Sequence, residues 1–261
     1  MPTNINFDKK LGVTSRNTTI TLPSASGFTN VNSLFLDGVD DYVETDANYT
    51  VLDGAQKFTV SLWVKPAVTA TRMLLSVVRN TAMNNFQLAV ATHNGDVRVF
   101  TDTTGKYVQT GSGELVNNVW TNVIVACDLT QTTASLKGNV YINGIDKTAG
   151  RNLSISSLQN SSSKLTFGYN ENGKYSANGD YFQGHIDEVA IWDGLDLRND
   201  VSTIFNGGTP DDLNNNGLTA PTNWWRMGDN DGGTGSTTLT DAAGSANGTL
   251  INSASYDPDV P

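Results

Sequence analysis

The chain of 261 residues carries 26 acidic and 16 basic side chains, for a net charge of −10, and a single cysteine. Such an acidic chain does not suit nucleic-acid phosphates, and Cys127 alone excludes an intrachain disulfide. No apolar stretch approaches the ~20 residues of a membrane span, and no secretory signal follows Met1. We therefore expect no nucleic-acid partner and no membrane insertion. The length of the chain suits one large sandwich or two small domains.

The predicted elements are short β-strands in which apolar and polar residues alternate, separated by Gly, Asn, Asp and Ser. This pattern is typical of an all-β sandwich. It recurs at 33–44, 58–66, 86–90, 97–99, 123–127, 140–142, 165–167 and 182–192. We expect residues 1–32 to form an arm or an extra strand, residues 33–209 the sandwich, and residues 210–261 a segment that packs on the same domain.

Two local signals are more specific. Asn143 and Gly144 directly follow an apolar strand, and both tolerate the positive φ of a type I′ hairpin turn. One helix is expected at 201–205, where Asp200 or the residue before it can cap the start. Asn206 with the following glycine can end this helix in the left-handed conformation.

Two strand patterns far apart in the chain carry aspartates. The first leads into a turn at 37–41, and the second is the strand at 182–192. Because strand side chains alternate sides, Asp187 is expected on one face with Val189 and Ile191. A carboxylate on that apolar face would be buried, and a buried charge needs a metal or several hydrogen bonds.

These patterns resemble the laminin-G-like branch of the concanavalin-A-like lectin/glucanase superfamily. The segments that carry the resemblance are 34–43, 58–66, 120–123, 140–144, 165–168 and 184–189. It implies a jelly-roll sandwich of two antiparallel sheets with one short helix, often with a bound calcium. Members include glycan binders, glycoside hydrolases or lyases, and structural modules, so the fold alone does not choose the function.

Calcium takes roughly six to eight oxygen ligands from carboxylates, amides and backbone carbonyls. Asp37, Asp40 and Asp41 surround Gly38, where the backbone can approach a cation closely. We predict a calcium ion held by Asp37, Asp41 and Asp187, which would join the early turn to the late strand. The alternative is a plain turn at 40–41 and an Asp187 that accepts hydrogen bonds.

Catalysis finds little support in the sequence. Glycosidases need two carboxylates placed about the scissile bond, and the hydrolytic relatives of this fold place acidic residues at alternate positions of one strand. Asp187 and Glu188 are adjacent, so we expect them on opposite faces of their strand and not as a catalytic pair. The protein is therefore expected not to be an enzyme.

Sugar binding needs an aromatic platform with amide and carboxylate partners. The stretch 168–181 interleaves three tyrosines with Asn, Glu and Asp and has few apolar anchors. We predict that it is a glycan-binding loop, with an ordinary long hairpin as the alternative. The predicted ligand-binding residues are Tyr169, Asn170, Glu171, Tyr175, Asp180 and Tyr181.

Residues 224–229 and 248–250 resemble the C-terminal half of laminin-G-like proteins encoded by marine bacteriophages. This resemblance implies a virion surface protein, a fibre, appendage or capsid-bound module that attaches to glycans. Its partners would be other virion proteins or further copies of itself, and its location the virion surface or the extracellular space. The alternatives are a secreted bacterial carbohydrate-binding domain and a diverged polysaccharide-degrading enzyme.

Overall fold

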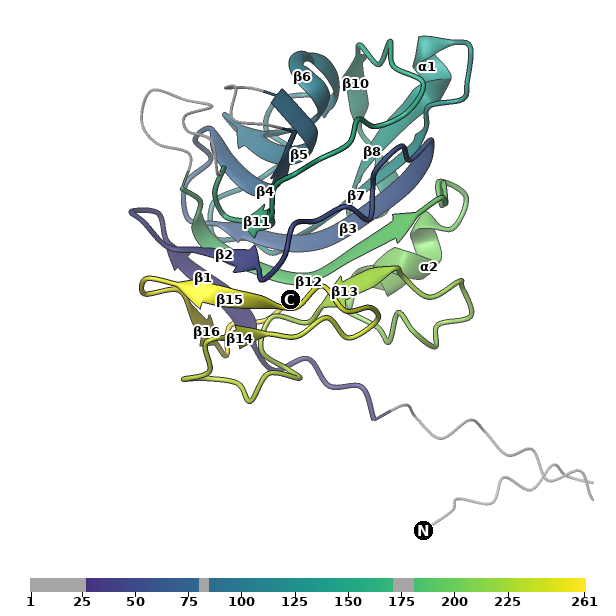
Figure 1. Cartoon of the computed structure of the whole chain (residues 1–261). Helices are drawn as coiled ribbons and strands as arrows, with labels where there is room; N and C mark the ends of the chain where they lie inside the picture. The colour runs from purple at the N-terminus through teal and green to yellow at the C-terminus, as the bar shows by residue number, and fades with distance from the viewer. Residues whose placement is uncertain (1–26, 80–84, 171–180) are drawn as a thin grey trace, which may run out of the picture.

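Two antiparallel sheets face each other in the computed structural model, which describes residues 27–79, 85–170 and 181–261 (Figure 1). Sheet A contains β1 (Ser33–Asp37), β3 (Lys57–Pro66), β7 (Thr121–Asp128), β8 (Gly138–Ile142), β9 (Ile145–Asp146), β12 (Gln183–Asp193), β13 (Asn223–Trp225) and β16 (Ser255–Asp257). Sheet B contains β2 (Tyr42–Thr45), β4 (Arg72–Val78), β5 (Asn85–His93), β6 (Asp96–Thr110), β10 (Thr148–Arg151), β11 (Leu165–Phe167), β14 (Thr238–Leu239) and β15 (Gly248–Ile251).

The strand order shows how the chain moves between the sheets. Sheet A runs β16-β1-β12-β3-β7-β8-β9, with β13 also paired to β12, and sheet B runs β10-β6-β5-β4-β11-β2-β15-β14. The successive strands β1 and β2 lie in different sheets, and so do β15 and β16. The predicted all-β sandwich of two antiparallel sheets is confirmed, and its described residues form 16 strands.

The core fills the space between the sheets with the apolar positions of the alternating strands. Phe58, Val60, Leu62 and Val64 of β3 have no exposed surface and meet the corresponding residues of the other strands. Cys127 of β7 belongs to the same core, as its position in the pattern predicts. The strand expected within residues 1–32 lies outside the described residues, except that 27–32 precede β1 without joining a sheet.

The helical elements are short. The helix α2 (Val201–Phe205) is confirmed, and Asn206 ends it in the left-handed conformation at φ 46° and ψ 44°. It is followed by a single 3-10 turn, η1 (Asn206–Gly208). One further turn of helix, α1 (Ala134–Lys137), precedes β8 and is too short to show a periodic pattern. No helix in the described part of the chain has the length and apolar character that a membrane span requires.

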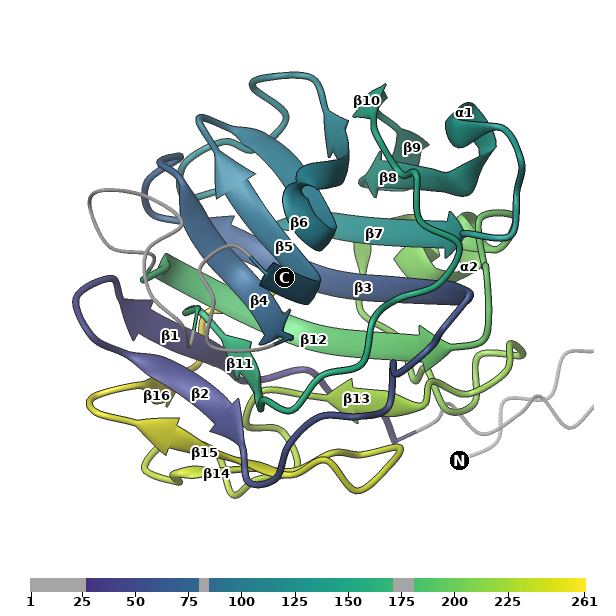
Figure 2. The same cartoon turned by 45° about the horizontal axis from the view of Figure 1, so that its top comes forward.

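The predicted hairpin turn is also confirmed, with Asn143 at φ 49° and Gly144 at φ 77° between β8 and β9. Helix α2 lies behind sheet A in Figure 2, on the side away from sheet B. There Ile204 packs in a second apolar cluster with Trp192 and Trp224, and Phe205 stacks on Trp63 at 6.0 Å between ring centroids. The outer face of sheet A is therefore covered where α2 crosses it.

A β-bulge interrupts β12. Its register with β3 passes from Asp187 opposite Trp63 to Ala190 opposite Ser61, so two residues of β12 face one of β3. The bulged Glu188 has φ 47°. Ile186, before the bulge, and Val189 and Ile191, after it, enter the core between the sheets. Asp187 directly follows Ile186 and therefore points to the other side. The prediction that Asp187 shares the face of Val189 and Ile191 is wrong, because the extra residue shifts the alternation.

The bulge also divides the edge of β12 between two partners. Strand β1 pairs with its first half, as in Leu34 opposite Ile186, and β13 pairs with its second half, as in Trp225 opposite Val189. Strand β3 follows the opposite edge along the whole length. Strand β12 thus joins two early strands, β1 and β3, to the late strand β13 around the point where Asp187 and Glu188 lie.

Candidate functional site

The connection from β1 to β2 holds three aspartates in a turn at 37–41, which we term the acidic turn. One carboxylate oxygen from each of Asp37, Asp40 and Asp41 lies within 4.8 Å of the others. Asp41 is fully buried. Its carboxylate accepts hydrogen bonds from the backbone N–H groups of Asp37 at 3.1 Å and Ser253 at 2.8 Å. The turn is thereby fastened to the connection between β15 and β16.

The acidic turn has the charge of a cation site. Burial raises the pKa of Asp41 above its usual value, the two backbone hydrogen bonds oppose this, and the charges of Asp37 and Asp40 raise it further. None of the three forms an ion pair with a basic side chain of the described residues. Three converging carboxylates without a cationic neighbour are a donor set that calcium fits.

Asp187 is not part of the acidic turn. The register places Asp37 opposite Gln183, so Asp187 lies four positions further along β12, or about 13 Å at the rise of a strand. One calcium ion cannot take ligands from both places. The predicted ligand set is therefore wrong in joining Asp187 to Asp37 and Asp41, because the antiparallel pairing carries these residues to opposite ends of β1.

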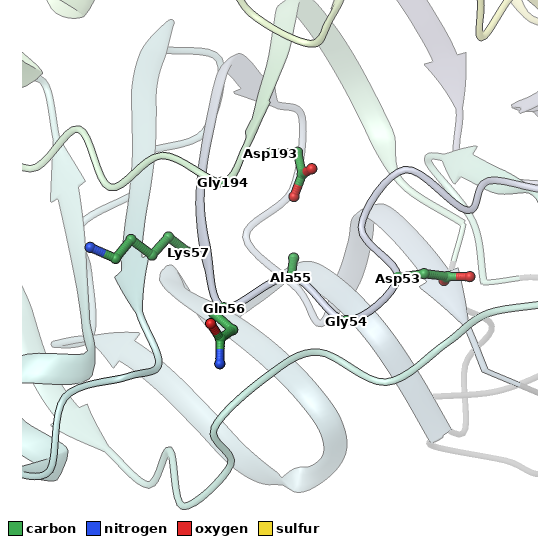
Figure 3. A pocket seen from close by; sticks show the side chains of 7 residues that line it. All are labelled: Asp53, Gly54, Ala55, Gln56, Lys57, Asp193 and Gly194. Carbon is green, nitrogen blue, oxygen red and sulfur yellow. The ribbon is translucent and has the colours of Figure 1, made fainter.

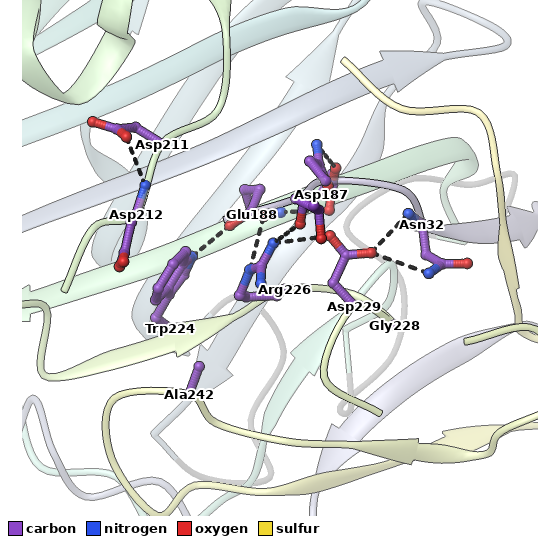
Figure 4. A network of polar contacts seen from close by, with 12 residues as sticks. Asn32, Asp187, Glu188, Asp211, Asp212, Trp224, Arg226, Gly228, Asp229 and Ala242 are labelled. Carbon is purple, nitrogen blue, oxygen red and sulfur yellow. Dashed lines mark hydrogen bonds and ion pairs between the residues drawn. The ribbon is translucent and has the colours of Figure 1, made fainter. Parts of the chain in front are cut away.

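Asp187 lies instead in the bulge network, which comprises Asn30, Asp187, Glu188, Trp224, Arg226 and Asp229. Figure 4 labels all of these residues except Asn30. Asp187 Oδ1 accepts a hydrogen bond from its neighbour's backbone N–H at 2.8 Å, and Oδ2 accepts one from Asn30 Nδ2 at 2.9 Å. Glu188 accepts hydrogen bonds from Trp224 Nε1 at 2.6 Å and Arg226 Nε at 3.2 Å. Asp187 is buried, as predicted, and it is held by hydrogen bonds.

The expectation that Asp187 and Glu188 point to opposite faces is also wrong. Both carboxylates enter the same network, because the bulge removes the alternation between these two residues. Their exposed fractions are 0% and 3%, so neither is accessible to a polysaccharide chain. Their adjacency therefore does not separate the two carboxylates, and it is their burial that keeps a substrate away from them.

The network fastens the segment 28–32 to sheet A. Asp229 Oδ1 accepts hydrogen bonds from the backbone N–H groups of Val31 at 3.1 Å and Asn32 at 2.9 Å. The Arg226 guanidinium donates to Asp229 Oδ2 at 2.9 Å and lies 4.3 Å from the centre of the Phe28 ring. The turn that begins at Asp229 thus has a structural role.

Three buried carboxylates face one guanidinium in this network. Burial, followed by the charge of Glu188, raises the pKa of Asp187 well above its usual value. Burial raises the pKa of Glu188 to about 7, although Arg226 and Trp224 favour its charged form. Because Arg226 contacts Glu188 and not Asp187, we assign a proton at neutral pH to Asp187.

Asn30 supplies an acceptor for that proton. Its Oδ1 is buried and has no hydrogen-bond partner among the residues that the structure describes, while its Nδ2 donates to Asp187. The two ends of an amide are interchangeable in shape, so a half-turn of the Asn30 amide brings Oδ1 to Asp187. A protonated Asp187 then donates to Asn30, and the unpartnered oxygen is satisfied.

The tyrosine cluster lies at the base of the predicted glycan-binding loop and comprises Tyr42, Tyr169 and Tyr181. The rings of Tyr169 and Tyr181 stack, with 4.5 Å between centroids and 12° between planes. Tyr42 lies 5.1 Å from Tyr169 and 6.5 Å from Tyr181. All three side chains are half-buried. The structure thus brings together two predicted ligand-binding tyrosines and adds Tyr42.

The other predicted loop residues have different positions. Asn170 is buried, with 2% of its surface exposed. Glu171, Tyr175 and Asp180 lie outside the described residues. Tyr42 was missed because its position depends on the pairing of β2 with β11, which places Val43 opposite Phe167. The sequence shows each strand but not which strands become neighbours.

The tyrosine cluster and the acidic turn are neighbours. Tyr42 directly follows Asp41, and a Cβ added to Gly168 would lie 3.8 Å from the Asp41 carbonyl oxygen. Gly168 has φ 80° and precedes Tyr169. The chain therefore approaches the turn closely at this glycine, and aromatic rings and carboxylates meet at one place on the sandwich.

A separate depression of about 420 Å³ is lined by 53–57, Asp193 and Gly194 (Figure 3). Lys57 pairs with Asp128 at 3.3 Å, and Asp53 accepts a hydrogen bond from Gln87 Nε2 at 2.7 Å. None of the described residues that line it is aromatic. It therefore lacks the stacking platform that the tyrosine cluster offers.

The bulge network predicts a pH dependence of stability. The pKa values of Asp187 and Glu188 are both raised, so the folded state keeps protons that the unfolded chain releases above its ordinary carboxyl pKa. The stability that this contributes is full at acid pH and falls as the pH rises, and the part due to Glu188 is lost as the pH passes about 7. Raising the pH from about 5.5 to about 8 should lower the melting temperature by a few degrees. Differential scanning calorimetry measures this.

Asp187→Asn should reduce this fall, because the amide remains neutral and its NH₂ group can donate to Asn30 Oδ1. Asp46→Asn is the matched control, since Asp46 is exposed and lies outside the network. Equal falls in the wild type and in Asp187→Asn would contradict the assignment of the proton to Asp187.

Known proteins share this fold. A laminin G family model, described as the concanavalin A-like lectin/glucanases superfamily, matches residues 37–202. A candidate carbohydrate-binding protein from Bacteroides ovatus is similar with a TM-score of 0.64 and 16% identity, over 90% of this chain. A heptameric SAP-like pentraxin from Limulus polyphemus has a TM-score of 0.54 and 15% identity, over 84% of this chain and 95% of its own.

This chain spans 62% of the length of the Bacteroides protein. No curated protein sequence matches it. At such identities the likeness to solved structures shows the fold alone. The family model, however, covers more than half of the chain and confirms the resemblance noted in the sequence. The chain therefore belongs to the concanavalin A-like lectin/glucanase superfamily.

Proposed function

We propose that this protein is a glycan-binding domain whose binding surface is the tyrosine cluster. The observation that carries the proposal is the stack of Tyr169 on Tyr181, with Tyr42 beside it. Half-buried aromatic rings offer an apolar face to the C–H groups of a sugar, and their hydroxyl groups can exchange hydrogen bonds with it. The lectin-like fold and the similarity to the Bacteroides protein support this function.

We propose that the domain is not catalytic. Asp187 and Glu188 are buried in the bulge network. Glu44 and Asp46 stand at alternate positions, but Glu44 pairs with Lys164 at 2.6 Å and Asp46 accepts a hydrogen bond from Thr249 at 3.0 Å. Both acidic pairs thus have structural partners. Glu171, Tyr175 and Asp180 of the loop remain predicted glycan contacts.

Removing one ring of the cluster tests the glycan site. A glycan array should identify a bound neutral oligosaccharide, and isothermal titration calorimetry should show at least a roughly tenfold weaker affinity for Tyr181→Ala, as for a central aromatic contact. Tyr141→Ala is the matched control, because Tyr141 is also half-buried but lies on β8. Loss of affinity in both variants alike, or in neither, would remove the cluster as the site.

We also propose that the acidic turn binds calcium. Asp37, Asp40 and Asp41 would hold the ion, whose charge would offset the repulsion among the three carboxylates and steady the turn beside Tyr42. Asp41 is already positioned by two backbone hydrogen bonds, so little ordering is needed for binding.

Calcium removal has a measurable consequence. An ion that binds only the folded state stabilises it by about 2.7 kcal/mol at a concentration a hundredfold above its dissociation constant, which is several degrees in melting temperature. EDTA should lower the midpoint and calcium restore it. Asp40→Asn should weaken this response, because its exposed side chain can lose a charge without loss of packing.

Two control variants make this test specific. Asp46→Asn, another exposed aspartate, and Asp187→Asn should both keep the full response to EDTA. A midpoint that is unchanged by EDTA and by added calcium would contradict the proposed ion. A response abolished by Asp187→Asn would contradict its location in the acidic turn.

We propose the virion surface as the place where this domain acts, alone or assembled with other virion proteins or copies of itself. The support is the resemblance of 224–229 and 248–250 to phage-encoded laminin-G-like proteins. Mass spectrometry of purified virus particles should detect the protein. Its absence from the particles, together with its presence in the culture medium of a bacterium, would favour the alternative of a secreted carbohydrate-binding domain.

A further inference from the structure

Four side chains form a row across the outer face of sheet A. Phe35, His185 and Lys65 stand opposite one another on β1, β12 and β3. Trp120 precedes β7 at the position opposite Lys65, because Val64 pairs with Thr121. The residues next to the row, including Val64, belong to the core, so the row faces away from sheet B. We term it the sheet A row.

The row combines aromatic surface with positive charge. The ring of His185 lies 5.1 Å from that of Phe35 and 6.0 Å from that of Trp120, tilted by 52° and 56°, so three neighbouring rings form the aromatic floor of the row. Lys65 lies in the same row and keeps 21% of its side chain exposed. The tyrosine cluster lies elsewhere, because Tyr42 belongs to β2 of sheet B.

A carboxylate of the same chain occupies the row. Asp259 Oδ1 accepts a hydrogen bond from Trp120 Nε1 at 3.0 Å, and Oδ2 pairs with Lys65 Nζ. Ser33 Oγ donates to the Asp259 backbone oxygen at 2.6 Å. Although burial acts the other way, Lys65 and Trp120 hold the pKa of Asp259 below its usual value. The row therefore has the chemistry of a carboxylate site.

The segment that carries Asp259 has few other anchors. After β16, Pro258 is exposed and Val260 and Pro261 are half-buried, and none of these three residues belongs to an apolar cluster. Its attachment across β1, β12 and β3 thus depends mainly on the polar contacts of one residue. Contacts of this kind are worth little when they are open to solvent, and Asp259 keeps 35% of its side chain exposed.

We propose that the sheet A row is a second ligand site, which binds the uronic acid unit of an acidic glycan, and that Asp259 fills it when no ligand is present. A uronic acid presents an apolar ring face for the aromatic floor and a carboxylate for Lys65 and Trp120. An acidic peptide offers the carboxylate but not the ring face, so the floor favours the sugar.

The charges around the row limit the ligand. Asp257 lies 3.6 Å from His185 Nε2 and repels further negative groups, and the whole chain carries a charge of −10. A long polyanion is therefore disfavoured, whereas a single uronic acid or a short oligomer avoids most of this repulsion. Binding should weaken as the salt concentration rises, because one ion pair orients the ligand.

Trigalacturonic acid and its methyl ester are the probes, because they share the sugar ring and differ in charge. Titration calorimetry on the whole chain at low salt should show that Asp259→Asn binds the acid roughly tenfold more tightly than the wild type, as expected when a competitor no longer fills most sites. The methyl ester should bind neither protein. The Trp120 indole signal should shift in the NMR spectrum on addition of the acid.

Lys65→Gln added to Asp259→Asn should abolish the gain, and Tyr181→Ala should leave it unchanged, which separates this site from the tyrosine cluster. Melting curves of each variant confirm that it is folded. Equal binding of the acid and its ester, or no binding of the acid by a folded Asp259→Asn, would overturn the proposal. Binding of an Asp-rich peptide in place of the sugar would overturn its ligand class.

Discussion

Burial of carboxylates is the constraint that organises the long connections of this sandwich. A buried charge is costly unless donors surround it, and loops supply such donors from their backbone N–H groups. Asp41 takes its donors from residues 37 and 253, and Asp229 takes its donors from 31, 32 and 226. Asp241 takes its donors from 223, 224, 243, 244 and 246. Each carboxylate joins segments that are distant in sequence or would otherwise be loose.

Sheet A needs this help because two of its late strands are short. Strand β13 has three residues and β16 has three, so few ladder hydrogen bonds hold them. The bulge in β12 lets β1 and β13 share one edge and brings Glu188 to Trp224 and Arg226. Aromatic rings lie on the outer faces of both sheets, those of Phe35 and Trp120 at sheet A and that of Tyr42 at sheet B.

Much of the fold could be predicted from alternation. The run 58–66 gave a core strand, and the Asn143 turn and helix α2 follow from local chemistry. The bulge could not be predicted in this way, because Glu188 has no intrinsic preference for φ 47° and adopts it where two strands compete for one edge. That single residue reversed both expectations about the direction of Asp187.

The candidate sites also differ in how far the sequence alone predicts them. Some site residues are close in sequence to their partners, namely Tyr169 with Tyr181 and the three aspartates of the acidic turn. Their residue types within one short segment were enough to predict them as site residues. Tyr42 and the sheet A row depend on which strands become neighbours, and Asp259 reaches Lys65 across a separation of 194 residues. Such contacts follow from topology, which a single sequence does not reveal.

Hydrogen–deuterium exchange with peptide resolution tests most directly whether buried carboxylates hold the connections. Asp41→Asn and Asp229→Asn each remove one charge and keep the shape of the side chain. The account predicts faster exchange at 37–43 and 252–254 in the first variant and at 28–32 in the second, with the strands of the core unchanged. An even increase across the whole chain, or no change in these segments, would contradict it.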